Sequence, residues 1–159
     1  MTQREVTEDL DTQELNKKKK MNKYFECKVS FEKLVENGTS KKVTESHLVD
    51  ALSFTEAEAR ITEAMKSYIS GEFSVSGIRR MRLAEIFTNE VGDRFYRIKV
   101  NFITLDEKSG SEKRTSVQML AQANSVTGAI SVLEEGMKGT ISDYTIVSVI
   151  ETKLMDIIK

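Results

Sequence analysis

An internal repeat is the feature that most constrains how this chain can fold. The segment Lys23–Phe31 aligns with Arg94–Phe102, and similar residues continue beyond a turn that is one residue longer in the second copy. Both copies alternate apolar and polar residues, break at a glycine-containing turn, resume the alternation, and change to helical periodicity at a serine. We therefore predict two copies of one strand-strand-helix-strand unit. The alternative is convergence of two generic amphipathic segments.

The identities continue into the predicted helices. They fall at Ala51, Ser53, Thr55, Ala57, Glu63, Met65 and Lys66 in the first copy and at Ala123, Ser125, Thr127, Ala129, Glu135, Met137 and Lys138 in the second. Each serine is placed to cap a helix through its hydroxyl, and Glu56 completes a capping box with the first one. Gly71 and Gly139 are expected to end the two helices.

The strands also carry local signals. Alternation puts Phe25, Cys27, Val29 and Phe31 on one face of the first strand, and Tyr96, Ile98, Val100 and Phe102 on one face of its copy. These faces are expected to form the core, so we interpret Cys27 as a packing residue. The last strands, over 73–87 and 144–158, are long enough to span two sheets, and a bulge is expected at Ser76 and Gly77.

The repeats define the expected organisation. Repeat 1 covers residues 24–87 and repeat 2 covers 95–158, and together they form a single domain over 23–159. Residues 1–22 are expected to be a mobile N-terminal extension. The fold class is α+β: an internally duplicated β-β-α-β unit with an antiparallel sheet, two helices and pseudo-twofold symmetry.

Composition excludes several classes of protein. The 24 basic and 25 acidic residues nearly balance, and one cysteine with one histidine allows neither an intramolecular disulfide nor the usual structural zinc site. No apolar run approaches a membrane span and no leader follows Met1, so we expect a cytoplasmic protein without a membrane partner. A phosphate-binding loop, a serine elbow and paired histidines are all missing. We expect no enzyme activity, metal or cofactor.

Several segments resemble a known family. They are Phe25–Val29, Lys42–Glu45, Leu48–Arg60, Ile69–Phe73 and Glu135–Thr140. With them the chain resembles an uncharacterised domain-of-unknown-function family of short proteins from gut Bacteroidetes and their crAss-like phages. The resemblance covers both repeats. It implies a phage or mobile-element setting and supplies no catalytic or binding residue.

One strand face suggests nucleic-acid binding. Tyr24 and Phe95 lie on the side opposite the core pattern, where aromatic rings could stack on bases and cations could follow a single-stranded backbone. The other members of this predicted site are Lys28, Arg97, Lys99, Asn101, Arg80 and Arg82. Alternatively, helices or the other half cover this face, or its charges are merely solvated.

The two hairpins carry basic pairs, Lys41 with Lys42 and Lys113 with Arg114. They could hold one anionic ligand such as a nucleotide, or they could protect exposed sheet edges from aggregation. The leading hypothesis is therefore a non-enzymatic nucleic-acid-binding or accessory protein of a phage or mobile element. The alternatives are a small-nucleotide-sequestering counter-defence protein and a protein-interaction module, and the sequence identifies neither a protein partner nor an oligomeric state.

Three positions are polar in the first copy and apolar in the second. Glu45, His47 and Arg79 correspond to Val117, Met119 and Ile150. A buried charge requires a partner, so we expect a salt bridge between Glu45 and Arg79 with His47 within reach. The cluster is either a ligand-facing pocket or a tolerated ion pair at a sheet edge.

Overall fold

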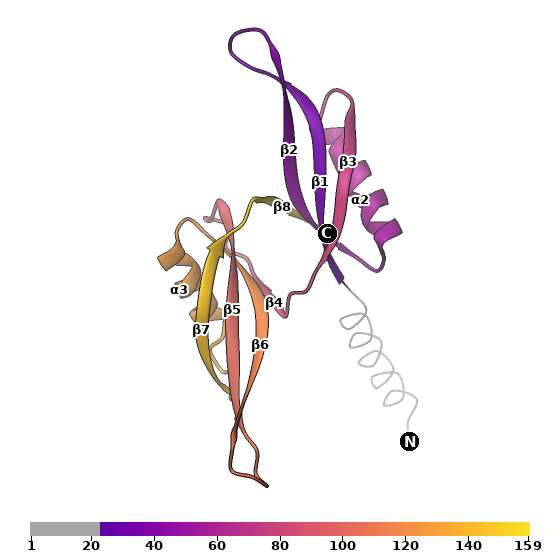
Figure 1. The fold of residues 1–159 in the computed structure, drawn as a ribbon. Coiled ribbons are helices and arrows are strands. Elements are labelled where there is room, and N and C mark those ends of the chain that lie inside the picture. Colours follow the sequence, from indigo (N-terminus) through magenta and orange to yellow (C-terminus); the bar gives the residue numbers. More distant parts are fainter. Residues whose placement is uncertain (1–22) are drawn as a thin grey trace, which may run out of the picture. The chain divides into compact units, whose positions relative to one another are not determined.

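The computed structural model describes residues 23–159, so the extension expected at 1–22 lies outside the described residues. The elements are β1 (Lys23–Leu34), β2 (Ser40–Ala51), α2 (Phe54–Tyr68), β3 (Phe73–Met81), β4 (Glu85–Phe87), β5 (Arg94–Leu105), β6 (Glu112–Ala123), α3 (Val126–Gly136), β7 (Asp143–Glu151) and β8 (Leu154–Ile158). They form two compact units, which Figure 1 shows. Unit 1 holds the described residues up to Met81 together with 156–159, and unit 2 holds 82–155.

Unit 1 is a four-stranded sheet with one helix. Its strand order is β3-β1-β2-β8, and β1 runs antiparallel to both β2 and β3. Helix α2 packs along one face of the sheet (Figure 1). Its buried residues Ala57, Ile61 and Met65 meet the alternate β1 residues Phe25, Cys27 and Val29. This arrangement confirms the predicted core face of the first strand.

Unit 2 repeats this plan with other residues. Its strand order is β4-β6-β5-β7, and β5 runs antiparallel to both β6 and β7. Helix α3 buries Ala129 and Leu133 against Tyr96, Ile98 and Val100 of β5. The predicted core face of the second copy is therefore also correct.

The long last segment of each repeat forms two strands that belong to different sheets, as its length predicted. Residues 82–84 separate β3 from β4, and residues 152–153 separate β7 from β8. Strand β4 joins the sheet of unit 2 and β8 joins the sheet of unit 1. The unit boundaries therefore differ from the repeat boundaries at 87 and 95, because each sheet contains the last strand of the other repeat.

The α+β class is confirmed, with one correction to the sheet. The prediction was an antiparallel sheet, whereas β4 runs parallel to β6, with Ile86 opposite Leu120. A parallel pair needs a long connection between its strands, and the chain from β4 through β5 to β6 provides it. The single-domain description and the pseudo-twofold relation stay predictions.

The predicted serine caps and hairpin turns form, but neither glycine predicted to end a helix does so. The Ser53 hydroxyl accepts from the Glu56 amide at 3.1 Å, and the Ser125 hydroxyl accepts from the Gly128 amide at 3.0 Å. Gly38 and Gly110 occupy the left-handed region in the hairpin turns, with φ of 83° and 68°. Gly71 does not end its helix, because α2 already ends at Tyr68 with an extended residue at Ile69. Gly139 does not end its helix either, because α3 ends at Gly136 and is capped by Met137.

A bulge interrupts β3 where the sequence predicted it. Lys28 pairs with Gly77 and the next β1 residue, Val29, pairs with Val75, so Ser76 is the extra residue. A matching irregularity in unit 2 falls at Val147, between the pairs Lys99–Ser148 and Val100–Ile146. The bulges change which β3 and β7 side chains share a face with β1 and β5.

Candidate nucleic-acid interface

The sheet of unit 2 has one face turned away from α3, which we call the open face. The register places alternate residues of three strands on it: Arg97, Lys99 and Asn101 of β5, Arg114, Ser116 and Gln118 of β6, and Thr145, Ser148 and Ile150 of β7. Lys99, flanked by Gln118 and Ser148, stands near its middle. The open face therefore combines three cations with hydrogen-bonding side chains.

The cations of the open face have no acidic partner. Lys99 and Arg114 are exposed and Arg97 is half-buried, and within residues 23–159 no carboxylate lies within ion-pair distance of them. Two acids share the open face with Arg114: Asp143 lies in the same register row, across Ile103, and Glu112 lies two residues before Arg114 on β6. The charges of Arg97 and Lys99, which have no acid in their register rows, are therefore the most available to an anionic ligand.

Asn101 is held in a defined orientation. The Ser116 hydroxyl donates to its Oδ1 at 2.6 Å across the β5–β6 pair. Because the carbonyl oxygen is occupied, the amide nitrogen remains to donate hydrogen bonds outwards. Asn101 is thus suited to contact a phosphate or carbonyl oxygen beside Lys99.

The matching face of unit 1 is electrically balanced. Arg79 of β3 donates to Glu26 of β1 at 2.8 Å, so this cation is already paired. Lys28 is exposed, and Ser30, which corresponds to Asn101, shares hydrogen bonds with Thr44 and Ser76. Unit 1 therefore presents less free positive charge than unit 2.

The predicted stacking role of Phe95 requires correction. Phe95 is only 5% exposed. The segment after β7 returns to this end of β5, where the Thr152 amide and hydroxyl both donate to the Phe95 carbonyl oxygen, at 2.9 and 2.7 Å. Strand alternation gives the side of the sheet on which Phe95 lies, but it carries no information about how deeply that side chain is buried in the folded chain. Tyr24, its counterpart in unit 1, is half-buried.

The remaining basic residues of the predicted site do not gather on one surface. Arg80 lies opposite Phe25 and therefore on the side of the sheet that faces α2, although its own side chain is exposed. Arg82 follows the end of β3 and is exposed. Of the eight predicted residues, the structure brings together Arg97, Lys99 and Asn101.

The basic residues of both hairpins are exposed, but the two side chains of each pair do not point to the same side. Lys41 pairs with Lys33 and Lys42 with Glu32, so the two neighbouring lysines point to opposite faces of the ribbon. The same alternation separates Lys113 from Arg114 in unit 2. Arg114 therefore contributes to the open face, whereas Lys113 lines a hollow with the acidic residues Asp106 and Glu112.

The predicted salt bridge between Glu45 and Arg79 is wrong. Glu45 pairs with Val29 and lies on the face covered by α2, whereas Arg79 pairs with Glu26 on the opposite face. Strand β1 also lies between β2 and β3, so the two residues are not on neighbouring strands. The part of the prediction that placed His47 near Glu45 is correct, because the His47 Nε2 to Glu45 Oε2 distance is 3.6 Å.

The pair formed by Glu45 and His47 is buried and incompletely bonded. The two side chains are 13% and 4% exposed, and Glu45 Oε2 and both ring nitrogens of His47 have no hydrogen-bond partner. Burial lowers the pKa of His47 below its ordinary value, against the opposite influence of the Glu45 and Asp156 carboxylates. Cys27, opposite His47, is a packing residue: burial, together with the Glu26 carboxylate, raises the pKa of its thiol to about 11.

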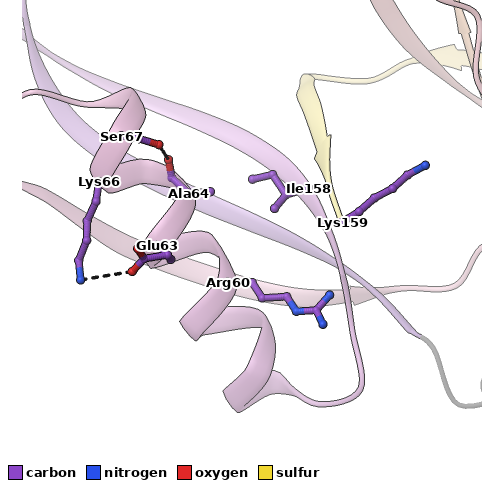
Figure 2. A pocket seen from close by; sticks show the side chains of 7 residues that line it. All are labelled: Arg60, Glu63, Ala64, Lys66, Ser67, Ile158 and Lys159. Carbon is purple, nitrogen blue, oxygen red and sulfur yellow. Dashed lines mark hydrogen bonds and ion pairs between the residues drawn. The ribbon is translucent and has the colours of Figure 1, made fainter.

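A groove of ≈ 760 Å³ runs between α2 and the end of the chain, and Figure 2 shows its lining. Ala64 of the helix and Ile158 line the groove, together with the cations Arg60, Lys66 and Lys159. Two of these cations are already engaged, Arg60 with Glu56 at 2.6 Å and Lys66 with Glu63 at 3.6 Å. The groove therefore offers an anion less free charge than the open face does.

Sequence reasoning missed part of the open face. Ser116, Gln118 and Ser148 become neighbours of Lys99 and Asn101 only through the strand register. A polar residue at every second position of Arg114–Gln118 was the available signal, since it implies one solvent-facing side of that strand.

Two further observations concern metal binding and membrane spanning. Across residues 23–159, no three His, Cys, Asp or Glu side chains come together as ligands for a metal ion. Neither α2 nor α3 is long and apolar enough to cross a membrane.

Comparison with known proteins places the chain in a family without a known activity. No curated protein and no solved structure matches it. The model of one family, described as a domain of unknown function, matches residues 23–159 and so includes both units and all ten described elements. The chain therefore belongs to this domain-of-unknown-function family, DUF4494.

Proposed function

We propose that this protein is a non-enzymatic nucleic-acid-binding protein of a phage or mobile element, acting in the cytoplasm, and that the open face of unit 2 is its binding surface. The observation that carries the proposal is that Arg97, Lys99 and Arg114 lie on one sheet face and have no acidic partner among residues 23–159. Cations along a strand face can contact successive phosphates, and the release of counterions supplies affinity.

A single-stranded ligand fits this surface better than a duplex. Its flexible backbone can follow a twisted sheet, and its unpaired bases can contact the half-exposed side chain of Ile150 and the oriented amide of Asn101. Because Phe95 is buried, most of the affinity comes from backbone contacts. Binding should therefore depend strongly on salt and weakly on sequence.

Fluorescence anisotropy with labelled single-stranded oligonucleotides across a range of salt concentrations tests this function. The double variant Arg97→Ala with Lys99→Ala should weaken binding and reduce the slope of log K against log salt by about 0.7 for each cation removed. Lys28→Ala is the matched control, because Lys28 occupies the position of Lys99 in the balanced face of unit 1. It should leave the slope nearly unchanged.

Two results would contradict the proposal. One is the absence of salt-dependent binding by the parent protein, and the other is an equal loss in the Lys28→Ala variant. A thermal shift with mononucleotides in place of oligonucleotides would favour the alternative of a nucleotide-sequestering protein. If neither ligand binds, a protein-interaction module is the remaining hypothesis.

A further inference from the structure

The buried pair in unit 1 calls for a separate explanation. Both nitrogens of His47 and one oxygen of Glu45 are buried without a hydrogen-bond partner, which is costly and uncommon in folded proteins. The corresponding residues of unit 2, Val117 and Met119, are apolar and occupy the same positions beside β5. The fold itself therefore does not require polar groups there.

The groups around His47 come from four elements. Glu45 lies on the same strand, and Cys27 lies opposite His47 on β1. The ring of Tyr68, at the end of α2, meets the imidazole edge-on with centroids 6.2 Å apart. The Asp156 carboxylate of β8 acts on it from the neighbouring strand. His47 is thus enclosed between the sheet, the helix end and the last strand.

Strand β8 is the part of this enclosure best able to open. It has five residues, lies at the edge of the sheet beside β2, and exposes Met155 and Asp156 to solvent. Short edge strands open locally at a lower free energy than the whole domain unfolds. Opening of β8 would bring water to His47 while β1, β2 and β3 stay paired.

We propose that Glu45 and His47 form a proton-binding site that controls the attachment of β8 to unit 1, so that protonation of His47 favours release of the strand. This site is independent of the open face and of nucleic-acid binding. At neutral pH the imidazole is uncharged, and an uncharged ring costs less to bury than the imidazolium ion. In acid, the imidazolium ion is hydrated only when β8 opens, although Glu45 and Asp156 offset part of its cost.

The direction of the pH effect follows from burial. The pKa of His47 is lower in the closed state than its ordinary value of 6.5, which applies once the ring is solvated. The open state therefore binds more protons than the closed state. Attachment of β8 is complete above the ordinary pKa and weakens as pH falls below it.

Amide hydrogen exchange of the full chain tests the proposal at about pH 7.5 and about pH 5.5, after correction for intrinsic exchange rates. Protection of residues 154–158 should fall by up to about tenfold in acid, the largest factor that one proton can give over the unit of pH below its ordinary pKa. Strand β4 is the internal control, because it lies beside Met119 in the other sheet. Its protection should not change.

Variants of His47 complete the test. His47→Met copies the unit 2 residue and should abolish the pH response of β8, and His47→Gln provides a second non-titrating variant if the first does not fold. His47 is the only histidine of the chain, so its ring signal in a proton NMR titration gives its pKa directly in the parent protein. An unchanged response in either variant, an equal response of β4, or a His47 pKa at or above its ordinary value would overturn the proposal.

Discussion

The two units use the same order of elements to bury different interiors. In unit 1 the second strand places Glu45 and His47 under α2, whereas unit 2 has Val117 and Met119 at these positions. Both interiors contain an alanine and an aliphatic residue from the helix at matching places, Ala57 with Ile61 and Ala129 with Leu133. The shared arrangement of strands and helix therefore depends on the helix–sheet contact. The neighbouring strand positions can be polar in one unit and apolar in the other.

A second difference concerns how each helix meets the edge strand that comes from the other repeat. In unit 1 Ala64 and Ile158 both pack against the core, and in unit 2 the corresponding residues are Gly136 and Phe87. A Cβ atom added to Gly136 would overlap the Phe87 ring. The small residue on α3 thus matches the large residue on β4, so the two positions complement each other in volume.

The outer faces differ as well. Unit 1 neutralises its cation Arg79 with Glu26, whereas in unit 2 Arg97 stands at the position of Glu26 and has no acidic partner within residues 23–159. Two differences between the copies, Arg97 for Glu26 and Ile150 for Arg79, therefore replace an ion pair with a cation and an apolar residue. This comparison suggests that the two units have separate roles, a proton-sensitive interior in one and an anion-binding surface in the other.

The largest expected effect tests whether the two cores are separate. Ile61→Ala and Leu133→Ala truncate matching residues, each fully buried, and each should lower the free energy of unfolding by about 2–5 kcal/mol through lost burial and a cavity. Hydrogen exchange should show the loss of protection mainly in the mutated unit. Denaturant titration gives the magnitude, and equal loss of protection in both units for both variants would mean that they unfold as one body.

A smaller effect is expected at the contact between α3 and β4. Gly136→Ala should destabilise the protein by about 2–3 kcal/mol, because the added methyl group meets the Phe87 ring and overpacking outweighs the better helix propensity of alanine. The double variant Gly136→Ala with Phe87→Ile copies the pairing of unit 1 and should recover most of the loss. Thermal unfolding of the single and double variants measures the coupling, and additive losses would contradict the volume complementarity.

The sequence allowed most of the elements to be predicted, for a physical reason that particular residues make clear. Alternation identified the face containing Phe25 and Cys27 because one side of that strand is buried along most of its length. The serines 53 and 125 were recognisable because a cap acts through bonds to amides three residues away. Local signals of this kind do not depend on which strands become neighbours.

The pairing of distant segments could not be predicted in the same way. Nothing local in β4 or β8 indicates which sheet it joins, and nothing local in β5 indicates that the Phe95 side chain is buried. The wrong partner for Arg79 has the same origin. Comparison of the copies showed that Arg79 is polar where the second copy is apolar. Its partner depends on strand order, because β3 lies beside β1, which carries Glu26, and not beside β2.

The candidate site also combines residues that local signals identify with residues that only strand pairing identifies. Lys99 and Asn101 were found because they alternate with core residues on one strand, whereas their neighbours Ser116 and Ser148 required the register of two further strands. The membership of a surface built across a sheet is therefore the part that a single sequence leaves open.

The smallest expected effect distinguishes the starts of the two helices. Ser125→Ala should cost about 1 kcal/mol, because α3 has no acidic residue in its first turn to replace the lost bond to the Gly128 amide. Ser53→Ala should cost about half as much. In α2 the Glu56 carboxylate still accepts from the Leu52 amide at 3.0 Å and stays at the positive end of the helix dipole.

Thermal unfolding followed by circular dichroism measures both losses, and hydrogen exchange in the first turn of each helix locates them. The variant Glu56→Ala supplies the control, because in its presence the Ser53 substitution should become as costly as the Ser125 substitution. If Ser53→Ala alone already costs as much as Ser125→Ala, then Glu56 does not substitute for the cap. The greater dependence of α3 on its single serine would then have to be abandoned as a difference between the units.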